Sequence, residues 1–144
     1  MSLENTLNEL FVDLFRKVLE IEEKTIRKKY SNMTLNDMHV IQAIGPGEGK
    51  NMSTVAGTLH VTMGTLTISI NSLVKKGYVS RVRSEKDRRV VLVSLTKDGL
   101  EAYQNHQQYH QKMIEAVVQN LDEQEREVLR RALSKLQAFF EGFL

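Results

Sequence analysis

The stretch Asn51–Leu95, NMSTVAGTLHVTMGTLTISINSLVKKGYVSRVRSEKDRRVVLVSL, decides the fold of this 144-residue chain. Its pattern predicts two short helices followed by a basic β-hairpin, which together form a winged helix-turn-helix. The second helix is expected to begin at Thr62, whose side chain can cap the amides of the first turn. It is expected to end at Gly77, because glycine suits the left-handed residue just after a helix. Asn51 is expected to cap the first helix, Met52–His60.

The second helix of this stretch has two different faces. Leu66, Ile70, Leu73 and Val74 recur at helical spacing and predict a side that packs into the core. The opposite face carries small, hydrogen-bonding or cationic residues and one apolar residue: Gly64, Thr65, Ile68, Asn71, Ser72 and Lys75. Such a face suits the major groove of DNA, where hydroxyl and amide groups can bond base edges or phosphates. An ordinary solvated helix face is the alternative interpretation.

A hairpin with a charged tip follows this helix. Tyr78–Arg83 alternates as a strand, SEKDR interrupts it, and Arg89–Leu95 predicts the returning strand. The stretch Asn51–Leu95 contains seven basic and two acidic residues and so carries +5, which leaves −3 for the rest of a chain whose net charge is +2. The positive charge is therefore concentrated on the helix and the hairpin, as nucleic-acid binding requires.

The residues from Val55 to Gly99 closely resemble the signature of MarR-type transcriptional regulators. The shared motifs are a Leu-x-x-x-Gly turn at Leu73–Gly77, an Asp-x-Arg wing tip at Asp87–Arg89 and a Leu-Thr-x-x-Gly exit at Leu95–Gly99. The resemblance implies a mainly α fold with a small β-wing, formed by one domain over residues 1–144. Within it, 51–95 would be the winged-helix lobe, and 1–30 and 97–144 would be dimerisation helices.

The resemblance also assigns roles to residues of the helix and the wing. Arg88 or Lys86 would enter the minor groove, while Asp87 and Arg89 would hold the wing tip in shape. The full candidate DNA-binding set is Thr62, Gly64, Thr65, Ile68, Asn71, Ser72, Lys75, Arg81, Arg83, Lys86, Arg88 and Arg89. The implied partner is a double-stranded, pseudo-palindromic operator, and the implied function is sequence-specific repression. A non-specific architectural DNA-binding protein would share the basic patch and is a distant alternative.

Within the family, the sequence looks most like the fatty-acid synthesis repressors of Firmicutes. The likeness lies in the stretches His60–Val79 and Ile21–Glu23 and in the positions of the histidines. This likeness implies an effector that is a long acyl chain on acyl carrier protein, which would be a further partner. An apolar channel for the chain is expected to be lined by Leu14, Val18, Ile41, Ile44, Met113 and Val117. In this branch the ligand tightens DNA binding, whereas most MarR proteins are released by theirs. The sequence leaves that sign, the operator and the regulon open.

The two ends of the chain predict long apolar helices. The first, Leu3–Lys29, has a wide apolar stripe from Leu3 to Leu19, and the last ends in Phe139, Phe140 and Phe143. Three exposed Phe side chains would favour aggregation, so a partner subunit is expected to cover them. Burial of the first stripe against the C-terminal helices of the same chain is an alternative that does not exclude a homodimer. A dimer would match half-sites about one helical turn, roughly 10 bp, apart.

Other segments predict helix boundaries. Thr34 with Asp37 predicts a capped helix start, and Asp122 with Glu125 predicts another. Thr96 is expected to cap a long helix that runs to about Asn120. The glycine-rich run Gly45–Gly49 is followed by Lys50-Asn51 rather than the Lys-Ser/Thr ending of a phosphate-binding loop, so it is interpreted as a linker.

Histidines form the remaining candidate site. His106 and His110 lie one helical turn apart on the expected long helix, and His39 lies on the expected second helix. His-x-x-x-His on a helix is sound geometry for zinc, and Glu20, Glu22 and Glu23 near the end of the expected first helix could complete a site with nitrogen and oxygen ligands. Zinc-responsive MarR relatives use acidic and His residues at comparable positions. The alternative is that these side chains are solvated or line the ligand pocket, and no metal or other cofactor is then expected.

Composition excludes several classes of protein. The chain is 41% hydrophobic but has no apolar run long enough to span a membrane, and it lacks cysteine, which excludes disulfides and thiol redox sensing. Its first residues lack the pattern of an export signal, so a cytoplasmic location is expected. No nucleophile, zinc-protease, Rossmann or P-loop motif is present, so no enzymatic activity is expected.

Overall fold

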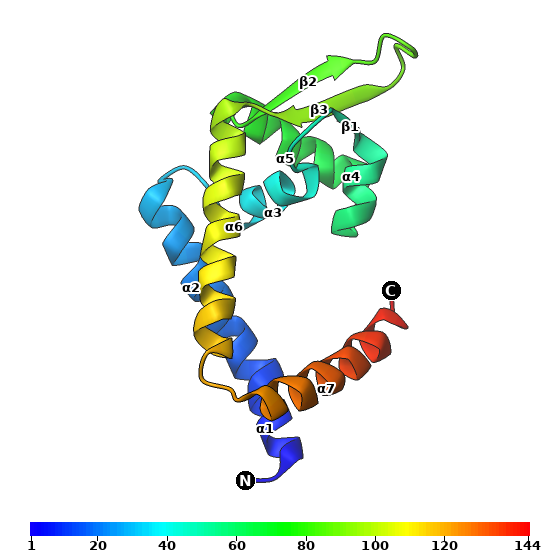
Figure 1. Cartoon of the computed structure of the whole chain (residues 1–144). Helices are drawn as coiled ribbons and strands as arrows, with labels where there is room; N and C mark the ends of the chain where they lie inside the picture. Colours follow the sequence, from blue (N-terminus) through cyan, green and yellow to red (C-terminus); the bar gives the residue numbers. More distant parts are fainter. The chain divides into compact units, whose positions relative to one another are not determined.

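The computed structural model describes all residues from Met1 to Leu144, and the chain divides into two compact units, Met1–His106 and Gln107–Leu144. The fold is mainly helical, with a small three-stranded antiparallel sheet in the first unit (Figure 1). No helix combines the length and the apolar character that crossing a membrane would need.

The first helical run carries the wide apolar stripe of the N-terminal end. It consists of α1 (Leu3–Glu9), a π-helical segment η1 (Leu10–Leu14) and α2 (Phe15–Lys29), with helical backbone at both junctions. The predicted helix from Leu3 to Lys29 is therefore confirmed in its bounds, but its middle turn is π-helical rather than α-helical. A π-turn accommodates an extra residue and shifts the faces that follow, and a search for a regular helical period does not detect this.

Three helices of the first unit begin at the predicted caps. Helix α3 (Leu35–Ile44) has a complete capping box, in which the Thr34 hydroxyl oxygen accepts from the Asp37 amide at 3.1 Å and Asp37 Oδ2 accepts from the Thr34 amide at 3.0 Å. Asn51 caps α4 (Met52–Leu59). Thr62 caps α5 (Met63–Lys76), which ends at Gly77 with a φ of 89°. The predicted starts of these helices are confirmed. They could be predicted from the sequence because each capping bond joins residues only three positions apart.

The predicted hairpin is confirmed as β2 (Val79–Arg83) paired with β3 (Val91–Leu95), with Val79 opposite Leu95 and Arg83 opposite Val91. A third strand, β1 (Lys50–Asn51), pairs with the other edge of β3, so the strand order is β1-β3-β2. β1 was not predicted, because two residues are too few to show an alternating pattern. The pairing joins the start of α4 to the wing.

Two helices complete the chain. Helix α6 (Lys97–Val118) begins after Thr96, whose hydroxyl oxygen accepts from the Gly99 amide at 3.1 Å. Helix α7 (Glu123–Glu141) begins with the predicted Asp122–Glu125 capping box. Within the second unit no residue is buried, and Phe139 contacts Phe140 and Phe143 edge to face with ring centroids 5.2 and 5.3 Å apart.

The hydrophobic core lies in the first unit and positions α5. Leu66, Ile70 and Leu73, the predicted inner face of α5, are at most 1% exposed. They pack with buried side chains from α2, α3, α4, the sheet and the start of α6: Ile26, Met33, Met38, Val40, Ile41, Ile44, Val55, Ala56, Val79, Val93 and Ala102. Burial of one face of α5 leaves its opposite face at the surface.

Candidate nucleic-acid interface

The outward face of α5 is free of contacts from the rest of the lobe at most of its predicted positions. Thr65, Ile68, Asn71 and Lys75 are exposed, Ile68 to 73%, and Ser72 is half-buried. Gly64 is exposed as well, with no atom within 4 Å of the position that a Cβ would occupy there. A helix with one buried face and one such open polar face has the shape that fits a major groove.

Thr62 and Thr65 lie at the start of this face. The Thr62 hydroxyl oxygen accepts from the Thr65 amide at 3.2 Å, and the Thr62 hydroxyl donates to the Thr65 hydroxyl at 3.0 Å. Both bonds are local to the first turn of α5. Thr62 therefore shapes the beginning of the helix, and its predicted contact with DNA stays a prediction.

The tip of the wing is held by one ion pair. Arg89 donates from its backbone N and Nε to Asp87 Oδ1 and from Nη2 to Asp87 Oδ2, each at 3.1 Å. The side-chain bonds are the main cause that holds the pKa of Asp87 below its ordinary value, and the backbone bond contributes in the same direction. A lowered pKa in the folded state means that the pair is intact at neutral pH and is lost only as the pH falls through that lowered value.

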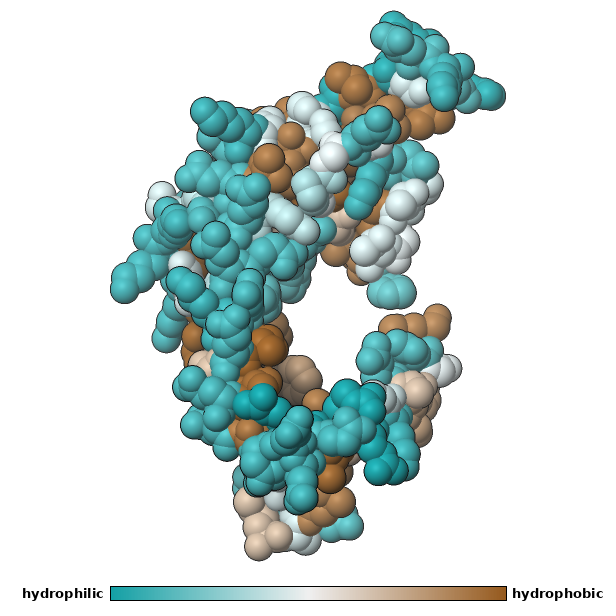
Figure 2. Space-filling model, in the orientation of Figure 1, coloured by the Kyte–Doolittle hydropathy of each residue, from teal (hydrophilic) through white to brown (hydrophobic).

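Four cations of the wing then separate into two kinds. Arg89 is paired with Asp87, and Arg83 donates from Nη1 to the carbonyl oxygen of Arg88 at 2.9 Å. The side chains of Lys86 and Arg88 form no hydrogen bond or ion pair and are exposed. Figure 2 shows hydrophilic residues gathered over this tip of the hairpin. The two unpaired cations are available to neutralise phosphates or to enter a minor groove.

The joint between α5, β2 and α6 is tightly packed. The Thr96 hydroxyl donates to the carbonyl oxygen of Gly77 at 2.6 Å, and the Thr96 amide donates to that of Tyr78 at 3.1 Å. A Cβ on Gly99 would lie 2.0 Å from the Tyr78 carbonyl oxygen. The Leu-Thr-x-x-Gly motif therefore has a structural reason, since only glycine lets the first turn of α6 approach the end of α5 so closely.

A partly buried ion pair holds α5 on α3. Lys76 Nζ donates to Asp37 Oδ2 at 2.8 Å, and the Asp37 side chain is only 7% exposed. The Asn36 amide donates to the Ser69 hydroxyl at 3.3 Å on the same pair of helices. Asp37 was predicted only as a capping residue, because nothing local links it to a lysine 39 positions away.

A second set of contacts joins α2 and α6 to the end of α5. Asn105 donates from Nδ2 to the Tyr30 hydroxyl at 2.7 Å, and the rings of Tyr30 and Tyr78 meet edge to face at 6.3 Å. The Tyr78 hydroxyl donates to Asn32 Oδ1 at 3.2 Å. Burial is the main cause that raises the pKa of Tyr78, and the charges of Tyr30, Asp98 and Asp37 raise it further. The hydroxyl is therefore a stable hydrogen-bond donor at neutral pH.

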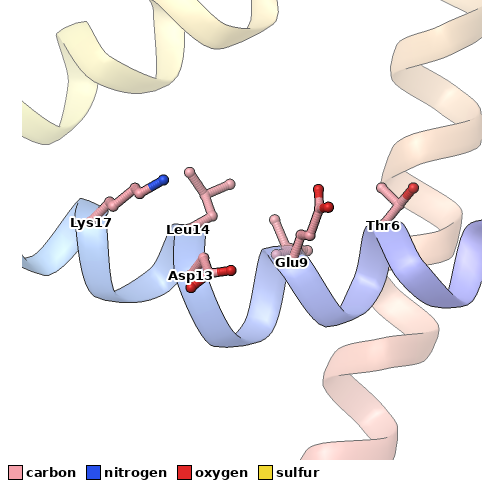
Figure 3. Close-up of a pocket in the computed structure, with 6 residues that line it drawn as sticks. Thr6, Glu9, Asp13, Leu14 and Lys17 are labelled. Atoms are coloured by element: carbon pink, nitrogen blue, oxygen red, sulfur yellow. The ribbon is translucent and has the colours of Figure 1, made fainter. Parts of the chain in front are cut away.

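The residues predicted to line an acyl channel lie in several places. Ile41 and Ile44 are buried in the core. Leu14 lies in an open hollow of about 530 Å³ on the first helical run, where Thr6, Glu9 and Lys17 lie along the same side (Figure 3). Val18 is half-buried, and Met113 and Val117 belong to the second unit. The hollow is lined by both polar and apolar residues, and the channel stays a prediction.

The predicted histidines differ in environment. His106 is buried, and its Nε2 lies 2.8 Å from Oε1 of the buried Glu22, which joins α6 to α2. His39 is half-buried on α3 and is not part of this pair. His110 follows one turn later on α6 and belongs to the second unit. Glu22 was named, with Glu20 and Glu23, as a candidate ligand of a zinc site, but its direct pairing with His106 was not predicted, because the two residues lie 84 positions apart.

The comparison with protein families agrees with this geometry. The family described as transcriptional regulator SarA/Rot matches residues 23–106, more than half of the chain. The chain belongs to this family. The predicted MarR-type winged helix is confirmed by solved structures. FabT of Streptococcus pneumoniae in complex with DNA is 37% identical, with a TM-score of 0.92 and coverage of 98% of this chain and 99% of that one.

Other relatives agree. A MarR protein of Peptoclostridium difficile is 25% identical, with a TM-score of 0.76 and coverage of 96% of this chain and 88% of that one. The regulator SarZ of Staphylococcus saprophyticus is 34% identical over 102 residues, 67% of each chain. The matches to SarZ proteins span 57 to 67% of those proteins' length. All of these relatives are transcriptional regulators, which confirms that this chain is a regulator and not an enzyme.

Proposed function

We propose that this regulator is a homodimeric, sequence-specific DNA-binding repressor whose α5 enters the major groove and whose wing contacts the minor groove. The observations that carry the proposal are the open polar face of α5 and the unpaired cations Lys86 and Arg88 at the tip of the wing. The similarity to FabT, which was solved in complex with DNA, supports it over nearly the whole chain. Footprinting on genomic DNA tests it. We expect protection of discrete pseudo-palindromic sites, whereas uniform protection would identify an architectural protein.

The two modes of DNA contact give a quantitative prediction. Replacing Arg88 by alanine is expected to weaken binding to the operator and to random DNA by the same factor. It should also reduce the salt dependence of binding, because one cation that neutralises a phosphate is lost. Replacing Thr65 by alanine is expected to reduce the free energy of binding by about 1 to 3 kcal/mol, mainly for the operator and much less for random DNA. Fluorescence anisotropy at several salt concentrations measures both. Equal losses on both DNAs for both variants would contradict this division.

Dimerisation is proposed from the exposed apolar side chains of both ends. The first helical run exposes Leu3, Phe11, Val12, Leu14, Phe15, Leu19 and Ile21, and α7 exposes Val128, Leu129, Leu133, Phe139 and Phe140, with Phe143 beyond its end. So much exposed apolar surface on a regular helix is typical of an interface. A second copy of the chain is the occupant that a two-fold symmetric operator requires.

Alanine at both Phe139 and Phe143 is expected to weaken the dimer by about 3 kcal/mol, roughly a hundredfold in dissociation constant, because the interface would lose the two rings that it buries. Sedimentation measures this, with Lys135→Ala as the control, since Lys135 is exposed on the same helix and forms no hydrogen bond or ion pair. A chain truncated before Phe139 should be a monomer or an aggregate. A well-folded dimer of that chain would rule out this interface.

The proposed effector is a long acyl chain on acyl carrier protein. Its support is the likeness to FabT and the apolar abundance of the terminal helices, and Arg27, Lys28 and Lys29 at the end of α2 offer cations to an acidic carrier. Mass spectrometry of what co-purifies, with metal analysis of the same sample, is the first experiment. Acylated carrier should then shift operator affinity more than its unacylated form does.

Zinc is the second candidate effector, and the buried Glu22–His106 pair favours it. A carboxylate oxygen and an imidazole nitrogen are suitable zinc ligands, but a zinc site needs three or four of them, and the pair supplies two. Zinc binding should weaken as the pH falls through the histidine range. If a chelator abolishes operator binding and zinc restores it in the wild type but not in His106→Ala with His110→Ala, zinc replaces the acyl chain as the effector.

A further inference from the structure

The outward face of α5 contains one preformed contact with the wing. Arg81 on β2 donates from Nη1 to Oδ1 of Asn71 on α5. Both side chains are exposed. Asn71 lies between Ile68 and Lys75 on the face that would enter the major groove, so the contact lies where base edges would be read.

The chemistry of the two side chains fixes the orientation of the amide. A guanidinium group has only donors, whereas an amide has an oxygen that accepts and a nitrogen that donates. If the amide of Asn71 were flipped, its NH₂ group would face the N–H groups of Arg81. Arg81 therefore holds the oxygen toward itself and leaves the NH₂ group of Asn71 free.

A free asparagine commonly recognises adenine with two bonds, because its oxygen accepts from N6 and its nitrogen donates to N7. In this pair the oxygen is already engaged by a cation. An adenine amino group that approached the remaining lone pair would bring a donor next to the donors of Arg81. Guanine instead offers two acceptors, O6 and N7, and no donor on that edge of the purine.

We propose that Asn71 and Arg81 act as one reading unit that presents only donors and selects guanine over adenine at one position of each operator half-site. This inference rests on the proposed insertion of α5 into the major groove. It assigns to Arg81 a role in specificity, in which it orients Asn71 and adds its own free N–H groups, beyond the neutralisation of phosphate that its charge alone would predict.

Selection from randomised duplexes by the full-length protein tests the inference. The wild type should enrich guanine at one position of each half-site, and Asn71→Ala should lose the preference at that same position. Arg81→Ala should reduce the preference for guanine over adenine there at least tenfold, because the released amide can then bond adenine. Preferences at the other positions should not change.

Lys75→Ala is the matched control, since it removes one exposed positive charge from the same face of α5. It should weaken all sequences and leave every base preference intact. If Arg81→Ala behaves like this control, Arg81 is only a phosphate contact and the inference is wrong. Adenine at the position read by Asn71 in the wild type would also overturn it. Enrichment of no sequence at all by the wild type would instead refute the proposed function, and the inference with it. Thermal unfolding should confirm that each variant is folded.

Discussion

Replacing Gly99 by alanine is expected to destabilise the protein by about 3 kcal/mol or more, and to leave a large fraction unfolded if the native stability is marginal. A Cβ at this position would lie 2.0 Å from the carbonyl oxygen of Tyr78 and 3.0 Å from its carbonyl carbon. Both atoms belong to the backbone that joins α5 to β2, so no side chain can rotate to make room. The first turn of α6 would have to move away from the end of α5.

Chemical denaturation followed by circular dichroism measures this loss. Gly57→Ala is the control, because Gly57 is an exposed position of α4 with no atom within 4 Å of the point where a Cβ would lie. That variant should be stabilised by about 0.5 to 1 kcal/mol, as alanine is a better helix former than glycine. Equal stabilities for the two variants would show that the close approach of α6 to Tyr78 is not required.

Replacing Asp37 by alanine is expected to cost about 2 to 4 kcal/mol, since it removes a capping box and one partner of a largely buried ion pair. The backbone amide of Thr34 and the ammonium group of Lys76 both lose their acceptor. The substitution should also weaken DNA binding, because Lys76 is in the last turn of α5 and the ion pair holds that helix on α3. Operator affinity should therefore fall although Asp37 itself is buried.

The control for this prediction is Glu127→Ala, which removes an exposed ion pair with Arg130 within α7. Exposed pairs of this kind contribute little to stability, so no measurable change is expected. Urea unfolding and operator titration are measured on both variants. A change for Asp37→Ala no larger than that for Glu127→Ala would mean that the contact with Lys76 does not hold α5 in place.

The sequence by itself determined where most helices begin and end, and therefore which face of α5 lies at the surface. The caps at Thr34, Asn51, Thr62 and Asp122 were predicted correctly because each depends on a bond to a residue three positions later. Gly77 was predicted for a similar local reason, since its left-handed backbone favours glycine. The hairpin and the concentration of positive charge were also readable along the chain.

The tertiary structure decided what these elements contact. Lys76 meets Asp37 across 39 positions, and Asn105 meets Tyr30 across 75. No local rule of propensity or period contains such pairs, because the partners are brought together only by packing of the core. β1 and the π-turn of the first helix were missed for a different reason: two residues are too few to show an alternating pattern, and a π-turn departs from the regular helical period.

For the candidate interface this division is clear at two residues. The sequence alone was sufficient to place Asn71 on the outward face of α5, because helical spacing sets the direction of each side chain. Only the fold revealed that Arg81 engages the oxygen of that amide, since the hairpin must turn back beside α5 before the two can meet. Local periodicity thus determined which residues are presented, and tertiary packing determined which of their hydrogen-bonding groups remain free.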